Sequence, residues 1–333
     1  MYILAFESSC DETSASVVEM SEQARTVKSN IVASQVATHA LYGGVVPEIA
    51  SRAHIEAISS ITYEALEQAG LTLSDISAIA VTNEPGLIGA VLVGVNFAKS
   101  LAYANGLPIV PVNHIKAHVA AAYLDQPELK PPFLALVVSG GHTSLFKVSS
   151  YTEYEEIGAT RDDAAGESFD KVGRVMGLPY PGGAAMDRLA SEGNAKAIRF
   201  PSPAIPDKTL DFSFSGLKTA VINHIHNAEQ KGVELNRADV AASFTATVCG
   251  GITEKLGLAL EETGMTRVVM AGGVAANSHL RRAVATLCEK HKASLFIPPM
   301  SLCGDNGAMV GAQGYYEFLA GNLGDESLNG YPS

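Results

Sequence analysis

The sequence predicts an α/β protein built from two copies of one structural unit, with a cleft between the two halves. An apolar strand, a turn rich in small polar residues and a returning strand occupy residues 2–18, and the same layout returns at residues 133–148. Short apolar strands alternate with longer helical segments in both halves, which is the pattern of layered α/β folds. A supersecondary unit that occurs twice indicates a duplicated core.

The length and the position of the repeat predict the domain organisation. A chain of 333 residues suits two domains or one large split domain. We expect a first subdomain over residues 1–130 and a second over residues 131–333, with the last helix packing back on the first. No linker rich in proline or glycine separates the halves, so we expect the hinge at the helix that starts near residue 114.

The first half is expected to alternate strands and helices. Short apolar runs predict strands at residues 2–6, 15–18, 78–82 and 109–112. One helix is expected at residues 48–68, and a long apolar helix through Tyr103 follows the loop at residues 84–89. That helix should end at Asn105 and Gly106, which favour the position just past a helix. Asn113 is a good N-cap for a third helix.

The second half is expected to follow the same logic. Apolar runs predict strands at residues 133–138, 144–148, 267–271 and 294–297. Helices are expected after residues 162–171, 181–187, 211–219, 272–277 and 303–307. Glycine turns at Gly182–Gly183 and Gly272–Gly273 precede two of them, and such turns let a ligand approach the backbone closely.

The charge balance limits how the chain can bind nucleic acid. It has 35 acidic residues against 23 basic ones, a net charge of −12. Proteins that bind nucleic acid unaided usually carry a basic surface, because neutralising phosphates supplies most of the non-specific affinity. A nucleic-acid substrate would therefore need a local basic cleft or a partner protein.

The sequence favours a cytoplasmic protein. No apolar run approaches the ~20 residues of a transmembrane helix, and the N-terminus has neither the basic region nor the apolar core of a signal peptide. The four cysteines contain no Cys-x-x-Cys pair, so neither a disulfide framework nor a zinc knuckle is expected.

Two histidines four residues apart form the first candidate site. His114 and His118 would lie on one face of a helix, where two neutral imidazoles can bind one metal ion with other ligands from elsewhere. The alternative is that both are surface or half-buried helix residues without a ligand.

Acidic residues form the other candidates, and each has a structural alternative. Asp11 and Glu12 lie in the first turn, where they would position a metal-bound water or accept a proton, or would simply be solvated. Asp305 precedes the last helix, as its N-cap or with its carboxylate directed into the cleft. Acids at residues 162–171 would complement a helix dipole, an explanation that is weaker for Asp170.

Together these motifs resemble the TsaD/Gcp family of tRNA threonylcarbamoyladenosine transferases over nearly the whole chain. The resemblance is carried, in order, by residues 7–13, 42–48, His114 with His118, 138–143, 162–171, 180–183, 211–219, 270–277 and 305–309. It implies the duplicated α/β fold of actin, Hsp70 and the sugar kinases, with two lobes and a central cleft.

The resemblance also implies an activity and its residues. The reaction would transfer the threonylcarbamoyl group from threonylcarbamoyl-AMP to N6 of adenine 37, in tRNAs reading codons that begin with A. His114, His118 and Asp305 would bind one divalent metal, Fe²⁺ in preference to Zn²⁺. The adenylate pocket would be formed by Val137, Val138, Ser139, Gly140, Gly141, Asp170, Gly183, Asp187 and Asn277.

The implied chemistry suits these residues. A carbamoyl adenylate is already activated, so positioning and charge stabilisation are the main requirements. Adenine N6 must lose a proton, and we expect Asp11, with Glu12, to accept it or to orient the acceptor. An acidic chain acting on tRNA needs help, and the family works with a TsaB-type partner and a TsaE-type ATPase. A homodimer is expected where the partner is absent.

Two other functions compete with this prediction. A zinc protease of the His-Glu-x-x-His type needs a glutamate after the first histidine, where this chain has Ile115. An ATPase or binding module of the actin or sugar-kinase type would suit the fold, since fold alone does not decide function. Such a module has no evident need for a two-histidine metal site.

Overall fold

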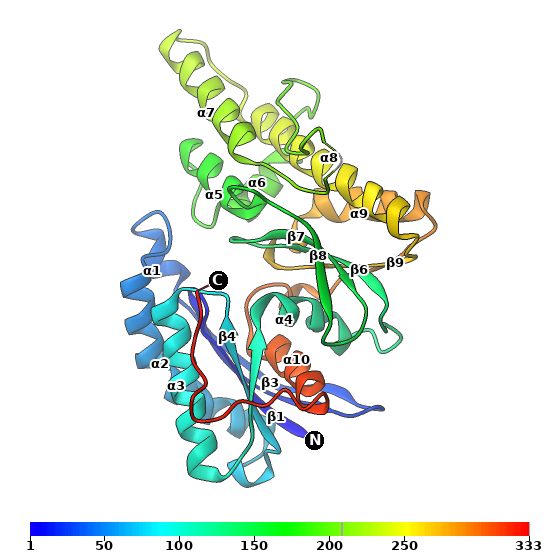
Figure 1. Ribbon diagram of the computed structural model, residues 1–333. Helices are drawn as coiled ribbons and strands as arrows, with labels where there is room; N and C mark the ends of the chain where they lie inside the picture. Colours follow the sequence, from blue (N-terminus) through cyan, green and yellow to red (C-terminus); the bar gives the residue numbers. More distant parts are fainter. Residues whose placement is uncertain (208, 333) are drawn as a thin grey trace. The chain divides into compact units, whose positions relative to one another are not determined.

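The computed structural model describes residues 1–207 and 209–332. Lys208 and Ser333, which fall inside the predicted second subdomain, lie outside the described residues. The described chain divides into two compact units (Figure 1). The first unit contains residues 1–131, 149–153 and 298–333, and the second contains residues 132–148 and 154–297. Compared with the expected division after residue 130, a short return segment and the whole C-terminal segment join the first unit.

Each unit is built on a mixed sheet. The first sheet has the strand order β3-β2-β1-β4-β5, and the second has the order β10-β9-β6-β7-β8. The strands of the first sheet are β1 Tyr2–Glu7, β2 Glu12–Met20, β3 Arg25–Ser34, β4 Ala78–Glu84 and β5 Ile109–Asn113. Those of the second are β6 Phe133–Val138, β7 Thr143–Val148, β8 Tyr154–Ala159, β9 Arg267–Ala271 and β10 Ser294–Phe296.

The two sheets have the same topology, which confirms the predicted duplication. In the first, β1 pairs antiparallel with β2 and parallel with β4. In the second, β6 pairs antiparallel with β7 and parallel with β9. The outer strands repeat this relation, with β3 and β8 antiparallel and β5 and β10 parallel to their neighbours.

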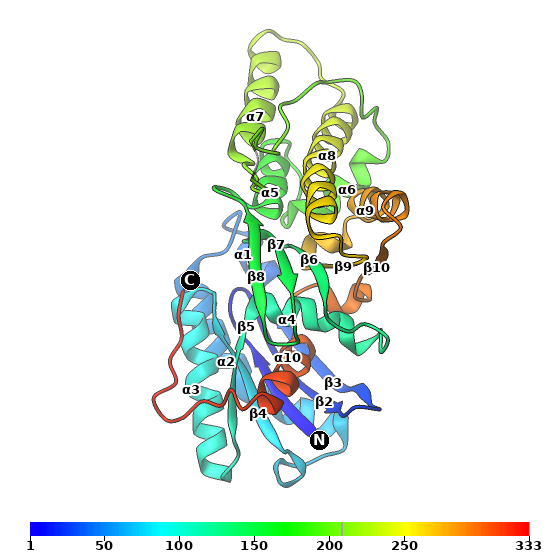
Figure 2. The ribbon, with the colours of Figure 1, turned by 45° about the vertical axis from the view of Figure 1, so that its right-hand side comes forward.

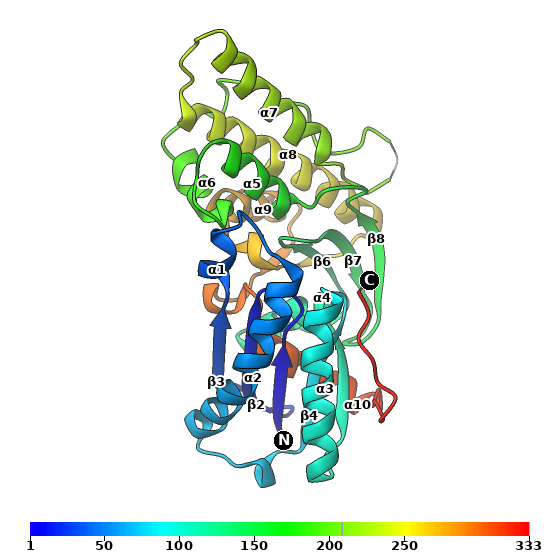
Figure 3. The ribbon, with the colours of Figure 1, turned by 90° about the vertical axis from the view of Figure 1, so that its left-hand side faces the viewer.

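Helices cover both faces of the first sheet (Figure 3). They are α1 Val36–Ala40, α2 Pro47–Ala69, α3 Ile88–Asn105, α4 His114–Ala120 and α10 Gly307–Leu319. Strand residues of one parity, such as Leu4 and Phe6, form an apolar core with α2 and α3. Residues of the other parity, such as Ala5 and Val18, face α10. Because successive strand side chains point to opposite faces, α10 lies on the face away from α2 and α3.

Helices also accompany the sheet of the second unit (Figure 2). They are α5 Ala165–Val175, α6 Gly182–Ala190, α7 Ser215–Gln230, α8 Arg237–Thr263 and α9 Ser278–Lys290. The predicted N-cap of α4 is confirmed, since the side chain of Asn113 accepts backbone N–H groups. Asn277 caps α9 in the same way. Gly106 ends α3 in the left-handed conformation, as expected.

Two expectations were wrong. The histidine helix α4 is not a hinge, because all of it lies in the first unit and the chain enters the second only after Pro131. Asp162 and Asp163 do not lie in the first turn of α5, which starts at Ala165. Asp162 instead accepts hydrogen bonds from Phe214 and Ser215 at the start of α7, and Asp163 pairs with Lys171 and Lys218.

The described residues contain no helix that combines the length and the apolar character needed to cross a membrane.

Three glycines let α10 lie directly on the first sheet. A Cβ placed at Gly307, Gly311 or Gly314 would fall within 3.0 Å of sheet atoms, which real contacts do not allow. Overpacking of this kind typically costs about 1–3 kcal/mol. The helix therefore owes its position, and that of the residues just before it, to the absence of these side chains.

We predict that Gly314→Ala destabilises the protein by about 1–2 kcal/mol in urea unfolding, although alanine is the better helix former. The added Cβ would fall 2.5 Å from the Cβ of Ala80 on β4, which has no flexible end to move. Gly250→Ala in α8 is the matched control, because its Cβ would meet no atom within 4 Å. The control should stabilise by about 0.5–1 kcal/mol. Equal effects of the two substitutions would contradict this packing.

Candidate functional site

His114 and His118 lie one turn apart at the start of α4. Asn113, the last residue of β5, caps the helix by accepting hydrogen bonds from Ile115 N and Lys116 N. The two imidazole rings are 4.6 Å apart between centroids and nearly perpendicular, at 76°. Their exposed fractions are 6% and 1%. The alternative that they are surface or half-buried residues is therefore wrong.

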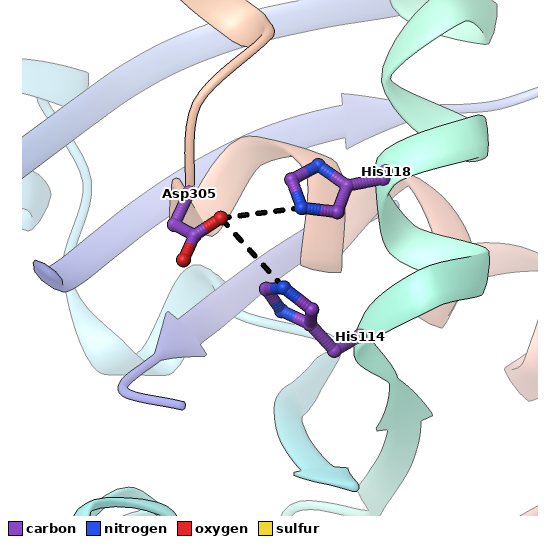
Figure 4. Close-up of side chains that lie close together, drawn as sticks. All are labelled: His114, His118 and Asp305. Carbon is purple, nitrogen blue, oxygen red and sulfur yellow. Dashed lines mark ion pairs between the residues drawn. The ribbon is translucent and has the colours of Figure 1, made fainter. Parts of the chain in front are cut away.

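Asp305 faces the two histidines from the loop before α10 (Figure 4). The cap of α10 is Asn306, whose side chain accepts a hydrogen bond from Met309 N, so Asp305 is not used as the N-cap. Its Oδ1 lies 3.2 Å from His118 Nε2 and 3.7 Å from His114 Nε2. Carboxylate and imidazole atoms thus converge from two segments that are distant in sequence.

These three residues fit a divalent metal ion. One ligand atom from each lies within 4.8 Å of the others. The contact between His118 Nε2 and Asp305 is short but lacks the direction of a hydrogen bond, and neither ring nitrogen of His118 has a hydrogen-bond partner among the described residues. A buried imidazole nitrogen without a partner is unusual, and coordination to a cation would satisfy Nε2.

Glu7 fixes the orientation of His114. This carboxylate, at the end of β1, accepts hydrogen bonds from His114 Nδ1 at 3.0 Å, Thr82 Oγ1 at 2.6 Å and Ser9 N at 2.6 Å. With Nδ1 bonded to Glu7, the Nε2 atom of His114 is directed toward Asp305. Metal-binding histidines usually have a carboxylate or carbonyl in this supporting position.

The charges around His114 shift the pKa values of both His114 and Glu7. Burial alone would raise the pKa of Glu7, but the neighbouring His114 ring holds it below its usual value. Burial alone would lower the pKa of His114, yet the carboxylates of Glu7 and Asp305 raise it to about 9. The sequence placed Glu7 in a motif without giving it a role. An acid at the end of an apolar strand was the signal, because buried acids need partners.

Asp11 and Glu12 lie where β1 turns into β2. Asp11 is buried, with 8% of its surface exposed, so it is not simply a solvated turn residue. Glu12 is half-buried and accepts a hydrogen bond from Ser34 Oγ at 3.0 Å. Burial, reinforced by the nearby carboxylates of Asp305 and Asp11, raises the pKa of Glu12 to about 9. Glu12 therefore holds a proton at neutral pH unless a cation at Asp305 offsets these charges.

In the second unit, the predicted pocket residues gather at one edge of the sheet. Strands β6 and β9 are parallel neighbours, with Val137 opposite Ala271, so both run to the same edge. The turn at residues 139–141 follows β6, and Asn277 follows β9. Ligands in open α/β sheets bind at such carboxyl ends.

Hydrogen bonds join this edge to α5, and further hydrogen bonds link α5 to α6 and α6 to α9. Amides of Gly166 and Glu167 at the start of α5 donate to the carbonyls of Ser139 and Gly140. Gly182 N donates to Asp170 Oδ1 at 2.7 Å, and Ser278 N donates to Asp187 Oδ1 at 3.0 Å. Leu280 N donates to Asn277 Oδ1 at 2.9 Å. These three side chains therefore have structural partners already.

Glycines leave part of this edge open. A Cβ placed at Gly140, Gly141 or Gly183 would meet no atom within 4 Å. A flat ligand can therefore approach the backbone at these positions. We call the set comprising Val137, Val138, Ser139, Gly140, Gly141, Asp170, Gly183, Asp187 and Asn277 the second-unit rim. Glu7, Asp11, Glu12, His114, His118 and Asp305 all belong to the first unit, and we call them the first-unit centre.

Solved structures with the same fold have diverse functions. Full-length HypF in a phosphate- and nucleotide-bound form aligns with a TM-score of 0.62 at 15% identity, covering 96% of this chain and 46% of that one. Component A of the (R)-2-hydroxyglutaryl-CoA dehydratase of Acidaminococcus fermentans has a TM-score of 0.56 at 14% identity, covering 95% and 98%. The ROK hexokinase of Thermus thermophilus has a TM-score of 0.53 at 14% identity, covering 96% and 100%. These similarities support the actin, Hsp70 and sugar-kinase type of fold.

Sequence comparison is more specific. The model of the TsaD family, tRNA N6-adenosine threonylcarbamoyltransferase, matches residues 26–312. A protein of that name from Moorella thermoacetica is 53% identical over 330 residues, covering 99% of this chain and 96% of its own. One from Clostridium botulinum strain 657 is 51% identical over 331 residues, with the same coverage. The chain belongs to the TsaD family of tRNA N6-adenosine threonylcarbamoyltransferases.

Proposed function

We propose that this chain transfers the threonylcarbamoyl group from threonylcarbamoyl-AMP to N6 of adenine 37, in tRNAs reading codons that begin with A. The first-unit centre would hold the metal and the general base, and the second-unit rim would bind the adenylate. The observation that carries the proposal is the convergence of His114, His118 and Asp305 in a chain of this family. A divalent metal on two imidazoles and one carboxylate keeps open positions for substrate oxygens, and there it would act as a Lewis acid.

The donor set favours Fe²⁺ over Zn²⁺. Two histidines and one carboxylate are the usual ligands of non-haem Fe²⁺ sites with open positions, while imidazole and carboxylate also suit Zn²⁺. No cysteine is among the proposed ligands, so the softer thiolate sites typical of structural zinc are not matched.

Asp11 and Glu12 have different roles in this proposal. Adenine N6 is a weak nucleophile and must lose a proton as it attacks the carbamoyl carbon. Asp11 accepts that proton. Without a metal, burial and the carboxylates of Asp305 and Asp11 raise the pKa of Glu12 to about 9. A divalent cation on Asp305 would offset part of that charge, so Glu12 is assigned the role of orienting the acceptor beside Asp11.

The second-unit rim binds the adenylate part of the donor. Gly140, Gly141 and Gly183 admit the nucleotide next to the backbone, and the N-termini of α5, α6 and α9 favour negative charge nearby. The hydrogen bonds that Asp170 and Asp187 accept hold the starts of α6 and α9 in place. The binding energy gained there positions the mixed anhydride for attack.

The proposal includes partner proteins. With a net charge of −12, the isolated chain has little long-range attraction for tRNA. A TsaB-like paralogous subunit and a TsaE-like ATPase would complete the active assembly in the cytoplasm, and two copies of this chain would associate when the TsaB-like subunit is missing.

We predict that Asp11→Asn lowers the transfer rate by about 100-fold or more, because a lost general base typically costs 10²–10⁴. The assay combines purified chain, partners, tRNA and threonylcarbamoyl-AMP, and measures modified adenosine. Glu12→Gln, which preserves a hydrogen-bond donor, should retain more activity than Asp11→Asn. Asp125→Asn removes an exposed acid and serves as the control. Full transfer by Asp11→Asn would refute the base role.

We also predict that Glu7→Gln weakens metal binding by about 10–100-fold, the usual effect of losing such a support. Glu7 accepts bonds on both oxygens. If the glutamine oxygen stays with Ser9 N, its NH₂ group faces His114 Nδ1 and forces the proton onto Nε2, the ligand atom.

The measurement is a metal titration against a competing chelator, with the thermal unfolding midpoint recorded in parallel. Glu19→Gln on β2, a partly exposed glutamate beside Lys28, removes the same charge and should leave metal affinity unchanged. Unchanged affinity in a folded Glu7→Gln variant would contradict the orienting role.

A further inference from the structure

A buried polar network lies behind the Asp11 turn and takes no part in the site described above. It consists of Thr13 on β2, Gln35 before α1, His39 on α1 and His54 on α2, which we call the histidine relay. His39 and His54 are completely buried, and Thr13 and Gln35 are 1% and 7% exposed. Polar side chains buried this deeply are costly unless their hydrogen bonds are satisfied.

The partners of His54 define its tautomer. Its Nε2 lies 3.0 Å from the carbonyl oxygen of Cys10. A carbonyl can only accept, so Nε2 carries the proton. Nδ1 is then an acceptor, and Thr13 Oγ1 donates to it at 2.7 Å. Burial lowers the pKa of His54, consistent with a neutral ring.

The partners of His39 define its tautomer in the same way. The backbone N–H of Val46 donates to His39 Nδ1 at 3.3 Å, so the proton is on Nε2. Nε2 donates to Gln35 Oε1 at 3.1 Å. The amide NH₂ of Gln35 then faces Ala50 O at 3.4 Å and His54 Nδ1 at 3.5 Å. With both rings neutral, each donor in the relay faces an acceptor, and Thr13 and Gln35 share the single lone pair of His54 Nδ1.

The relay ends on the two peptide groups that flank Asp11. His54 binds the carbonyl of Cys10, which belongs to the peptide before Asp11. The backbone N–H of Gln35 donates to the carbonyl of Asp11, which belongs to the peptide after it, at 3.0 Å. Fixing both peptide planes fixes the φ and ψ angles of Asp11, and with them the direction of its Cα–Cβ bond.

We propose that His54 and Gln35 are positioning residues that aim the Asp11 carboxylate, and that His39 connects this control to the loop ending at Val46. The inference rests on the proposed role of Asp11 in the transfer. The relay should therefore affect kcat and leave the affinities for metal and substrate unchanged. This follows because no relay residue belongs to the first-unit centre or the second-unit rim.

The kinetic test separates positioning from folding. His54→Leu removes the donor to Cys10, whereas the side-chain amide of His54→Gln restores one. We expect His54→Leu to lower kcat by about 10–100-fold, since small misplacements of reacting groups cost this much. KM for threonylcarbamoyl-AMP and metal affinity should stay within about two-fold, and His54→Gln should recover most of kcat.

Two threonines provide a matched pair. Thr13→Val leaves His54 Nδ1 without its hydroxyl donor and should lower kcat. Thr62→Val, further along α2, removes a buried hydroxyl whose partner among the described residues is in its own helix, Ile58 O at 2.6 Å. This variant should keep its kcat. Equal kcat losses in the two valine variants, or full kcat in folded His54→Leu, would overturn the proposal. Should His54→Leu not fold, the threonine pair carries the kinetic test.

A spectroscopic test is independent of catalysis. Long-range ¹H–¹⁵N correlation spectra of the full chain, assigned with His39 and His54 variants, should show both rings neutral with the proton on Nε2. A proton on Nδ1 or a charged ring at neutral pH would overturn the relay. If Asp11→Asn were fully active while the tautomers were as expected, the proposed base role would fail and the relay geometry would stand.

Discussion

The hydrogen bond between Glu7 and His114 is the interaction on which the first-unit centre depends. The side chain of Glu7 has no exposed surface, and a buried carboxylate is tolerated only with partners that compensate for lost water. Its partners come from the β1–β2 turn, from β4 and from α4. The same contact leaves the second ring nitrogen of His114 directed toward Asp305. One hydrogen bond thus both pairs the buried charge of Glu7 and orients His114 as a metal ligand.

The residues of the first-unit centre come from the ends of elements packed on one sheet. Glu7 ends β1, His114 follows β5, and Asp305 precedes α10. The last of these is positioned by close packing, because glycines allow α10 to lie directly on β1, β2 and β4. Backbone amides of Gly307 and Ala308 are also held by Ser14 and Asn30 of the sheet. The second unit repeats this topology, and its rim likewise follows the ends of parallel strands.

Much of this architecture could be predicted from the sequence where the signal is local. The apolar runs of β1, β4 and β6 and the caps Asn113 and Gly106 are short-range patterns, and they appear as predicted. Strand β3, by contrast, was not predicted, because Arg25–Ser34 is a partly exposed strand with mixed polarity and depends on pairing with β2. Asp162 was predicted to lie at the start of α5, but it accepts hydrogen bonds from the start of α7. The sequence did not indicate this because the two partners are more than 50 residues away.

The residues of the site could be only partly predicted from the sequence, for the same reason. Spacing and family resemblance nominated His114, His118 and Asp305, and the fold brings them together. The support from Glu7 and the relay through His39 and His54 depend on contacts between residues far apart in the chain. No sequence pattern marks such contacts, because a lone histidine in a helix gives no sign of which carbonyl it will meet. They follow from sheet register and helix packing, which only the folded chain supplies.

Locating the bound metal tests the central claim most directly. Crystals of the chain loaded with Fe²⁺ or Zn²⁺ should give one anomalous-scattering peak per chain at the absorption edge of that metal. The account predicts this peak about 2.0–2.2 Å from Nε2 of His114, Nε2 of His118 and a carboxylate oxygen of Asp305. A fully loaded chain whose metal is bound by other residues, with these three uncoordinated, would contradict it.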